Sequence, residues 1–445
     1  MRLSGAISLA TVLIAIFLAS PAFSAEDKDL SLQEAVEKGV LTNPEYAIVA
    51  DDRKAVDEEL NQARALYLPS IDARAESGWE HTDTPSIQDE SMMRNRVSLT
   101  LTQMLFDGWK TKKEVERQQA RVRSTSSRVG EAAEFSGLDT VEGFFEVLRQ
   151  RDLLAIAQAN VDDHLRILNK IQDGATAGTV TDGDLSQAHA RLAQAKATIS
   201  SIQEALRSAE SLFVQKTGDF PGSLVFPDVP RSALPSAVDD AVRMAITSSP
   251  TLSVFEADID VAKAEAEGTG STLYPKLEFE LNGTAGNDIA GIDGNENRAS
   301  ALAVMTWNLY RGGGDQARQR EFIYRHALAK ERRAAAARQV EKDVRDTWAG
   351  MVSANERAQE YMNQAQANEK VASVYLDQFS LDRRTLLDVL DSQNELFVSR
   401  SNHVNALYTE IFGVYRMLAL EGQLFKTLGL EHPREASVNL PATGK

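Results

Sequence analysis

The feature that most constrains this chain of 445 residues is an internal repeat with an offset of about 200 residues. In the first copy, an Asn-Pro pair precedes the strings LYLPSIDARAE and LFDGWKTK; in the second, a Ser-Pro pair precedes TLYPKLEFE and LYRGGGDQ. A repeat of this length sets the architecture before any local pattern does. We therefore predict two structurally equivalent halves, residues 25–218 and 236–430. The linker between them, residues 219–235, contains four prolines and cannot be one continuous helix.

Proline placement predicts very long helices in both halves. Residues 86–220 and 276–432 contain no proline and are rich in Ala, Gln, Glu, Arg and Leu, which favour helices. The predicted long helices are residues 108–173 and 182–217 in the first half, and 312–380 and 385–428 in the second. A helix over residues 108–173 would be roughly 100 Å long. Helices of this length must project from the body of a protein.

Heptad spacing of apolar residues predicts that these long helices pack as coiled coils. One ladder follows the second copy: Leu390, Phe397, Val404, Ile411, Leu418 and Phe425. Another follows the first copy: Leu185, Leu192, Ile199, Leu206 and Phe213. A repeat of seven keeps one stripe of a helix against its partner. Shorter helices, about residues 31–65 and 236–267, are expected to form a belt around this bundle.

Four segments alternate apolar and polar residues with the period of a β-strand. They are residues 70–80, 96–106, 276–285 and 299–310. In LEFELN, for example, apolar side chains starting at Leu277 alternate with polar ones starting at Glu278. The pattern suits a barrel between lipid and a watery lumen, and it also suits a soluble half-buried sheet. Four strands cannot close a membrane barrel, so several protomers would have to share one.

The segments between and beyond these elements carry further expectations. The polar stretches 81–95 and 286–298 are predicted to be long loops, and residues 431–445 a disordered tail. Residues 1–24 have a basic start, a short apolar run and small residues near the end, which is typical of a secretory signal peptide. No later segment approaches the roughly 20 apolar residues of a membrane helix.

Composition and motifs argue against catalysis and nucleic-acid binding. The net charge is −17, whereas nucleic-acid binding is driven largely by Lys and Arg. The chain has no cysteine, and its six histidines lack metal-ligand spacing. The glycine run at residues 311–315 lacks the Lys-Ser/Thr ending of a phosphate loop. We predict no enzyme activity, no cofactor and no metal site.

Two carboxylates at the start of the last long helix call for an explanation. Asp388 and Asp391 lie three residues apart and repel each other by a few tenths of a kcal/mol. Thr385 with Asp388, and Thr181 with Asp184, fit a capping box that starts a helix. For Asp184, capping and a functional role are equally supported. Asp391 lies one turn further in and gains nothing from a cap, which favours a functional role.

The strings RRTLLDVLDSQNELF and TVTDGDLSQAHARL resemble the TolC family of trimeric outer-membrane channels, and the resemblance extends over residues 30–430. It implies a mostly α-helical homotrimer in which each protomer gives four strands to a shared twelve-stranded membrane β-barrel. Long antiparallel coiled-coil helices would continue the barrel as a periplasmic tunnel. The family's gate residues carry over onto Asp388, Asp391, Arg384 and Asp184. Phe379 stands where a tyrosine hydroxyl would bond across the tip, and Gly183 where a threonine would stand.

The resemblance implies a passive duct in the outer-membrane lipid, opened by a periplasmic adaptor and an inner-membrane ABC exporter or proton-driven pump. The combination of Phe379 with LLDVLDSQNELF resembles members that serve type I protein secretion. Small-molecule efflux is the alternative. A soluble periplasmic adaptor or coiled-coil scaffold would explain the heptads, but it leaves the strands, the repeat and the signal peptide unexplained as a set.

Overall fold

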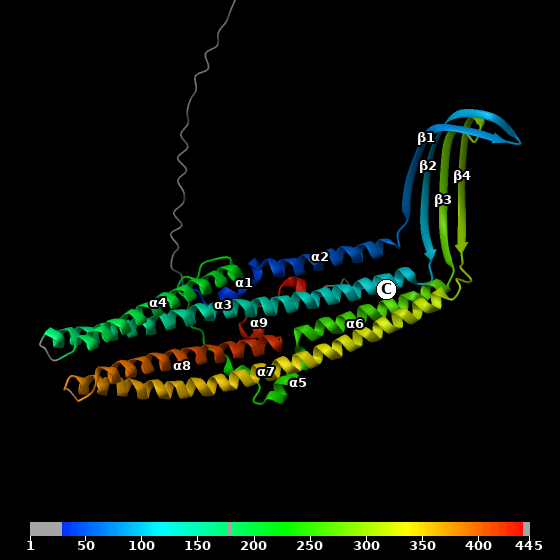
Figure 1. Cartoon of the computed structure of the whole chain (residues 1–445). Coiled ribbons are helices and arrows are strands. Elements are labelled where there is room, and N and C mark those ends of the chain that lie inside the picture. The colour runs from blue at the N-terminus through cyan, green and yellow to red at the C-terminus, as the bar shows by residue number, and fades with distance from the viewer. Residues whose placement is uncertain (1–28, 177–179, 382, 439–445) are drawn as a thin grey trace, which may run out of the picture.

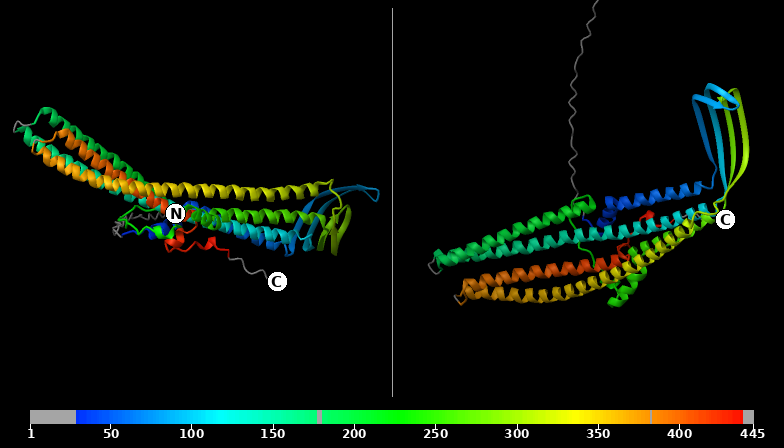
Figure 2. Two further views of the ribbon diagram at one scale, coloured as in Figure 1. Left: turned by 90° about the horizontal axis from the view of Figure 1, so that it is seen from below. Right: turned by 45° about the vertical axis from the view of Figure 1, so that its right-hand side comes forward.

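The computed structural model describes residues 29–176, 180–381 and 383–438. The predicted signal peptide lies outside these residues. The chain forms an elongated bundle of helices, and a four-stranded sheet stands at one end of it (Figure 1). Seen from below, the helices lie in a slab that bends part-way along its length (Figure 2). None of the described helices combines the length and apolarity that crossing a membrane requires.

The order of elements repeats, two helices, two strands and two long helices in each half. The first half comprises α1 (Leu32–Thr42), α2 (Pro44–Ala65), β1 (Ser70–Thr84), β2 (Ile87–Phe106), α3 (Lys110–Thr176) and α4 (Asp182–Thr217). The second comprises α5 (Val238–Ser248), α6 (Pro250–Gly268), β3 (Lys276–Ile289), β4 (Ile292–Thr306), α7 (Gly314–Phe379) and α8 (Leu386–Leu420), followed by the short α9 (Leu424–Thr427). The residues between the halves contain a 3-10 turn at Arg231–Ala233 and a bridge from Leu30 to Leu224.

The paired Asn-Pro and Ser-Pro motifs of the sequence start equivalent helices. Pro44 and Pro250 are the first residues of α2 and α6, a position where proline loses no helical hydrogen bond. The Asn43 side chain also accepts a bond of 2.9 Å from the backbone N–H of Glu45. Each motif therefore separates a short helix from the longer helix that leads into the sheet.

The sheet is antiparallel in the order β1-β2-β3-β4. Two hairpins, β1 with β2 and β3 with β4, are joined by pairing of β2 with β3, so the sheet combines both halves. The prediction of long loops at residues 81–95 and 286–298 is wrong. Those residues continue the strands to tight turns, because backbone pairing needs no apolar alternation. Polar cross-strand contacts support it: Arg94 donates to Glu76 and Glu80 at 2.9 and 3.0 Å.

Two elements, β4 and α8, end earlier in the structure than the sequence predicts. β4 ends at Thr306 rather than at residue 310, because Thr306 already pairs with Lys276, the first residue of β3. α8 ends at Leu420 rather than at residue 428. Gly422 interrupts it with a φ of 65°, and a Cβ on this residue would lie 2.8 Å from the carbonyl oxygen of Ser248.

The tail prediction is wrong for residues 431–438, whereas residues 439–445 lie outside the described chain. The ring of His432 stacks on Phe425 with centroids 5.0 Å apart. Residues Arg434–Ala436 form a 3-10 turn, and Ala436 packs against the main core. Contact with α9 and the core fixes this short strap, although its own composition is polar.

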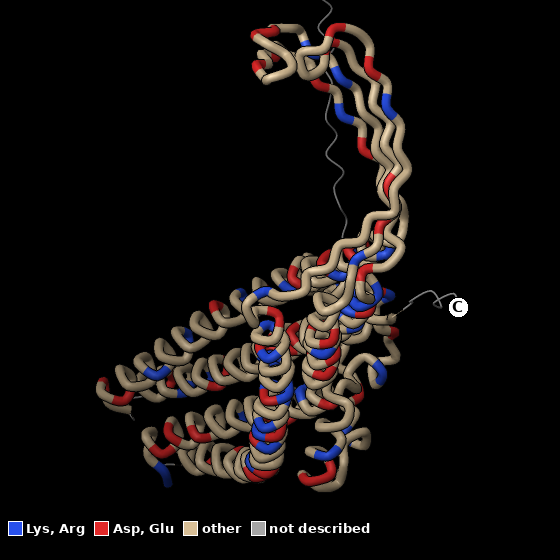
Figure 3. Tube along the Cα trace, turned by 90° about the vertical axis from the view of Figure 1, so that its right-hand side faces the viewer, with Lys and Arg blue, Asp and Glu red and all other residues tan. Residues whose placement is uncertain are grey.

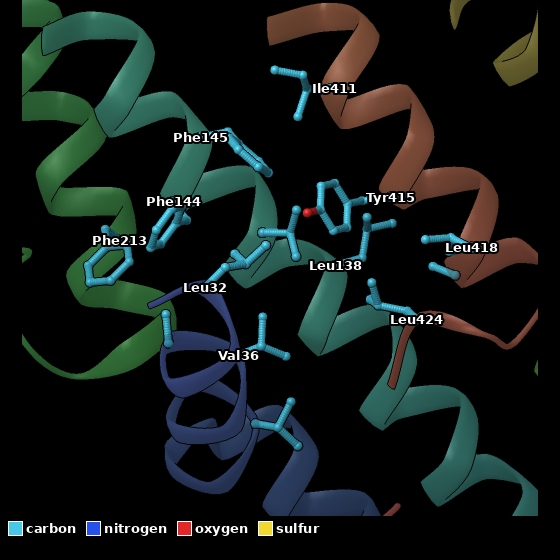
Figure 4. Close-up of a cluster of buried hydrophobic side chains, with 14 of the residues drawn as sticks. Leu32, Val36, Leu138, Phe144, Phe145, Phe213, Ile411, Tyr415, Leu418 and Leu424 are labelled. Atoms are coloured by element: carbon cyan, nitrogen blue, oxygen red, sulfur yellow. The ribbon is translucent and has the colours of Figure 1, made fainter. Parts of the chain in front are cut away.

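The main core lies midway along the bundle, where α1, α3, α4, α8 and α9 meet (Figure 4). Phe144 of α3, Phe213 of α4 and Tyr415 of α8 are almost fully buried there. Burying each large apolar side chain stabilises the fold by roughly 1.5–3 kcal/mol. The predicted heptad residues follow this pattern: Leu390, Ile411, Leu418 and Phe425 are buried, and Phe397 is half-buried.

Candidate functional site

The candidate site is the pair of helical hairpin ends that lie furthest from the sheet. α3 turns into α4, and α7 turns into α8, with the two ends side by side (Figures 1 and 2). An apolar cluster joins the hairpins there, including Ile167 and Ile171 of α3, Leu192 of α4, and Leu386 and Leu390 of α8. This packing sets the positions of all the polar groups considered below.

Asp388 is the third residue of α8 and belongs to a reciprocal capping box with Thr385. Its backbone N–H donates to the Thr385 hydroxyl at 3.2 Å, and its carboxylate accepts from that hydroxyl at 2.9 Å and from the Thr385 N–H at 3.3 Å. The Thr385 hydroxyl and N–H lower the pKa of Asp388, and Arg384 contributes further.

Asp184 occupies the equivalent position in the first half. It forms the same capping box with Thr181, whose hydroxyl donates to the carboxylate at 2.7 Å. Both repeat-related acids therefore start the returning helix of a hairpin, which is the structural role that the Thr-x-x-Asp spacing predicts. Their remaining surface is available to solvent, since the Asp388 side chain is 39% exposed.

Asp391 has a different partner. Its carboxylate accepts a hydrogen bond of 3.0 Å from the guanidinium of Arg191, on α4 of the other hairpin. The side chains are 53% and 30% exposed, so the pair contributes at most about 1 kcal/mol. No motif in the sequence singles out Arg191. Its signal was its place beside Leu192 of the predicted heptad ladder, where it flanks the packed stripe.

Arg384 lies in the turn between α7 and α8 and connects three groups. Its guanidinium lies over the ring of Tyr375 at 4.1 Å, and its Nε donates to the side-chain oxygen of Gln378 at 3.1 Å. It lies 3.8 Å from the carboxylate of Asp388. Tyr375 and Gln378 thus hold the Arg384 cation at the tip; the resemblance named Arg384, but nothing in the sequence pattern indicated these two partners.

Phe379, the last residue of α7, packs partly buried against the apolar tip cluster. Here the side chain serves packing rather than a hydroxyl contact across the tip. Gly183 is exposed in the first turn of α4 and has room for a side chain, since a Cβ would lie 3.4 Å from the Thr181 hydroxyl. The structure therefore brings Asp388, Arg384 and Phe379 to one hairpin end, Asp184 to the other, and links the two through Asp391.

Charged side chains are spread over the whole length of the described chain. Acidic and basic residues are interspersed along the helices and the sheet (Figure 3). In the described ranges no three His, Asp or Glu side chains are arranged to hold a metal ion. The polar groups of the hairpin ends include one ion pair between the two hairpins, Arg191 with Asp391.

Comparison with known families decides the class of protein. The family model described as "Outer membrane efflux protein" matches residues 41–218 and 241–410, one segment in each half of the chain. The chain belongs to this family. As a member of the outer membrane efflux protein family, it is an exit duct located in the outer membrane, and its helical hairpins form a tunnel in the periplasm. The alternative of a soluble periplasmic adaptor or scaffold is thereby wrong.

The individual relatives have low sequence identity to this chain, but the alignments cover most of both chains. The chain is 22% identical over 369 residues to outer membrane efflux protein BepC of Brucella suis, covering 83% of this chain and 80% of BepC. It is 22% identical over 429 residues to outer membrane protein TolC of Escherichia coli, covering 92% and 86%. Among solved structures, the CmeC outer membrane channel of Campylobacter jejuni superposes with a TM-score of 0.77 at 12% identity, covering 88% and 86%. The fold is thus that of TolC-like channels.

Proposed function

We propose that three copies of this outer membrane efflux family member assemble into one duct with a shared twelve-stranded barrel. Within the described residues, β1 and β4 each pair on one side only, so the sheet has two open edges. Open edges in lipid leave backbone N–H and C=O groups without partners, which costs several kcal/mol each. Neighbouring protomers supply the missing partners, and three sheets of four strands close the ring.

We propose further that the hairpin ends close the periplasmic entrance. The observation that carries this is the Arg191–Asp391 contact, because it ties the hairpin of the first half to that of the second. Opening that separates these hairpins must break it. In the trimer, Asp388 and Asp391 of three protomers line the entrance and attract cations. Arg384 and Phe379 fix the end of the hairpin that carries them, and Asp184 fixes the start of α4 in the other hairpin. A periplasmic adaptor and an energised inner-membrane pump open this closure.

For the cargo, we propose type I protein secretion, since LLDVLDSQNELF with Phe379 resembles secretion-type members. Small-molecule efflux is the second candidate, favoured by the similarity to a relative named as an efflux protein. The two are separated by deleting the gene and comparing secreted proteins with drug susceptibility. Loss of one secreted protein with unchanged susceptibility supports secretion; the reverse result supports efflux.

The closure is tested by single-channel recording in planar bilayers. Arg191→Ala and Asp391→Ala should each increase the open-to-closed ratio by up to about fivefold per protomer, the effect of about 1 kcal/mol. The charge swap Arg191→Asp with Asp391→Arg should restore the resting state. Arg207→Ala is the matched control, since Arg207 is exposed on the same helix and bonds only within it in the described chain. A swap that is no better than the single variants would contradict the latch.

A further inference from the structure

The residues that follow β4, at one open edge of the sheet, have no pairing partner within the described part of the protomer. β4 ends at Thr306, and residues 307–310 have no ladder partner among the described residues because β3 starts at Lys276. These residues include Trp307, Leu309 and Tyr310, which are half to four-fifths exposed. In the other half, β2 continues to Phe106 because β3 is there to pair with it. The contrast indicates that β4 lacks a partner strand along its far side.

The internal repeat identifies residues that are structurally equivalent in the two hairpins. Pro69 and Pro275 precede β1 and β3, so Ile71 corresponds to Leu277. Ile71 pairs with Leu101 of β2, and Leu277 pairs with Met305 of β4. Leu101 therefore corresponds to Met305.

The same correspondence extends along each strand. Two residues before Leu101, Leu99 corresponds to Ala303 of β4, and six residues after Ile71, Ser77 corresponds to Gly283 of β3. The contact between the two hairpins is the pairing of β2 with β3, in which Leu99 lies opposite Gly283. In a ring of three chains built from six similar hairpins, the contact between chains repeats this pairing. Replacing each residue by its equivalent puts Ala303 opposite Ser77.

We propose that β4 pairs with β1 of the neighbouring protomer in the antiparallel register that places Ala303 opposite Ser77. This inference rests on the trimer of the proposed function and specifies its interface. The register sets Ala301 opposite Trp79 and Ala73 opposite Trp307, so the tryptophan on each edge faces an alanine. It also gives residues 307–310 a partner in the first residues of β1. A large residue opposite a small one is found in the hairpin contact within the chain as well, where Leu99 faces Gly283.

Paired cysteines test the register, since the chain has none of its own. Residues directly opposite on antiparallel strands have Cα atoms about 4.5–5.5 Å apart, within the range of a disulfide. Diagonal neighbours are about 7–8 Å apart, which is too far. On oxidation of membranes, Ser77→Cys with Ala303→Cys should shift the protein from the one-chain to the three-chain position on a denaturing gel, and reduction should reverse the shift.

Further cysteine pairs test the alternative registers and provide a control within one protomer. Ser77→Cys with Ala301→Cys, or with Met305→Cys, represents a slip of two residues in either direction and should stay at the one-chain position. Leu99→Cys with Gly283→Cys is the equivalent pair within one protomer, and it should oxidise without changing the number of chains. Gly283 has room for the added Cβ.

The outcomes separate the register from the trimer. Linkage of chains by a slipped pair, or an internal disulfide between positions 77 and 303, would overturn the proposed register. Trimers captured by an amine-reactive crosslinker, with none of the three edge pairs linking chains, would also overturn the register while supporting the trimer. Monomers under that crosslinker, with the Leu99→Cys and Gly283→Cys pair oxidised, would overturn the proposed function itself.

Discussion

Two buried carboxylates beside the bend at Gly422 make the stability of the region where α8 ends and α9 begins depend on pH. Glu421, the C-cap residue that follows α8, is fully buried, and within the described chain neither of its carboxylate oxygens has a hydrogen-bond partner. Burial raises its pKa from 4.5 to about 7. Glu134 of α3 is buried too, with its pKa raised to about 7, although it accepts a bond of 3.2 Å from the N–H of Leu424.

The sign and size of the effect follow from proton binding. Below pH 4.5 both the folded and the unfolded chain hold the proton on Glu421, so burial carries no charge penalty. Between pH 4.5 and about 7 the unfolded chain loses its proton first, and stability falls as the pH rises. The rise from 4.5 to about 7 corresponds to roughly 3 kcal/mol per group, or about 100-fold in an opening equilibrium.

The variant Glu421→Gln removes this ionisation with little change of shape. At pH 8 the backbone amides of α9 should be about 100-fold better protected from hydrogen exchange than in the unmodified protein, and at pH 4.5 the two should be alike. Glu431→Gln, at an exposed site nearby, is the control and should leave the protection unchanged at both pH values. Equal protection of the Glu421→Gln variant and the unmodified protein at pH 8 would refute the reasoning, because it would mean that Glu421 is neutral or has a partner there.

Three further results are expected. Gly422→Ala should destabilise the bend by about 1–3 kcal/mol in thermal unfolding, because the left-handed φ and the Ser248 carbonyl oxygen both oppose an added Cβ. A melting temperature equal to that of the unmodified protein would contradict this. Thr181→Ala should cost about 1 kcal/mol of local stability at the start of α4, seen as faster amide exchange in its first turn only. Asp388→Ala with Asp391→Ala should lower cation selectivity and abolish block by multivalent cations in planar bilayers while trimers still assemble; unchanged selectivity would restrict these residues to helix capping and packing.

Much of the fold could be predicted from the sequence because its signals are local or periodic. Proline after Asn43 and after Ser249 starts equivalent helices, and the heptad spacing identifies residues such as Leu390 and Ile411 that are buried in the structure. The capping roles of Asp184 and Asp388 were also predictable, since a threonine three residues earlier is all that a capping box requires.

The end of α8 shows how a periodic signal can mislead. Leu418 and Phe425 keep the heptad spacing and both are buried, so the pattern predicts an unbroken helix to residue 428. The chain instead turns at Gly422 and restarts as α9, which returns Phe425 to the core by another path. Spacing reports burial, and burial does not require that the helix continue. The missed strand ends have a similar cause, since pairing near the turns relies on backbone bonds and polar contacts.

The contact of Asp391 could not be predicted because it depends on how two hairpins far apart in sequence pack together. It also has no counterpart under the repeat. The positions equivalent to Arg191 and Asp391 are Glu395 and Gln187, which carry no opposite charges. The repeat therefore offers no signal for this pair, and only the packing of the α3–α4 hairpin against the α7–α8 hairpin brings Arg191 and Asp391 together.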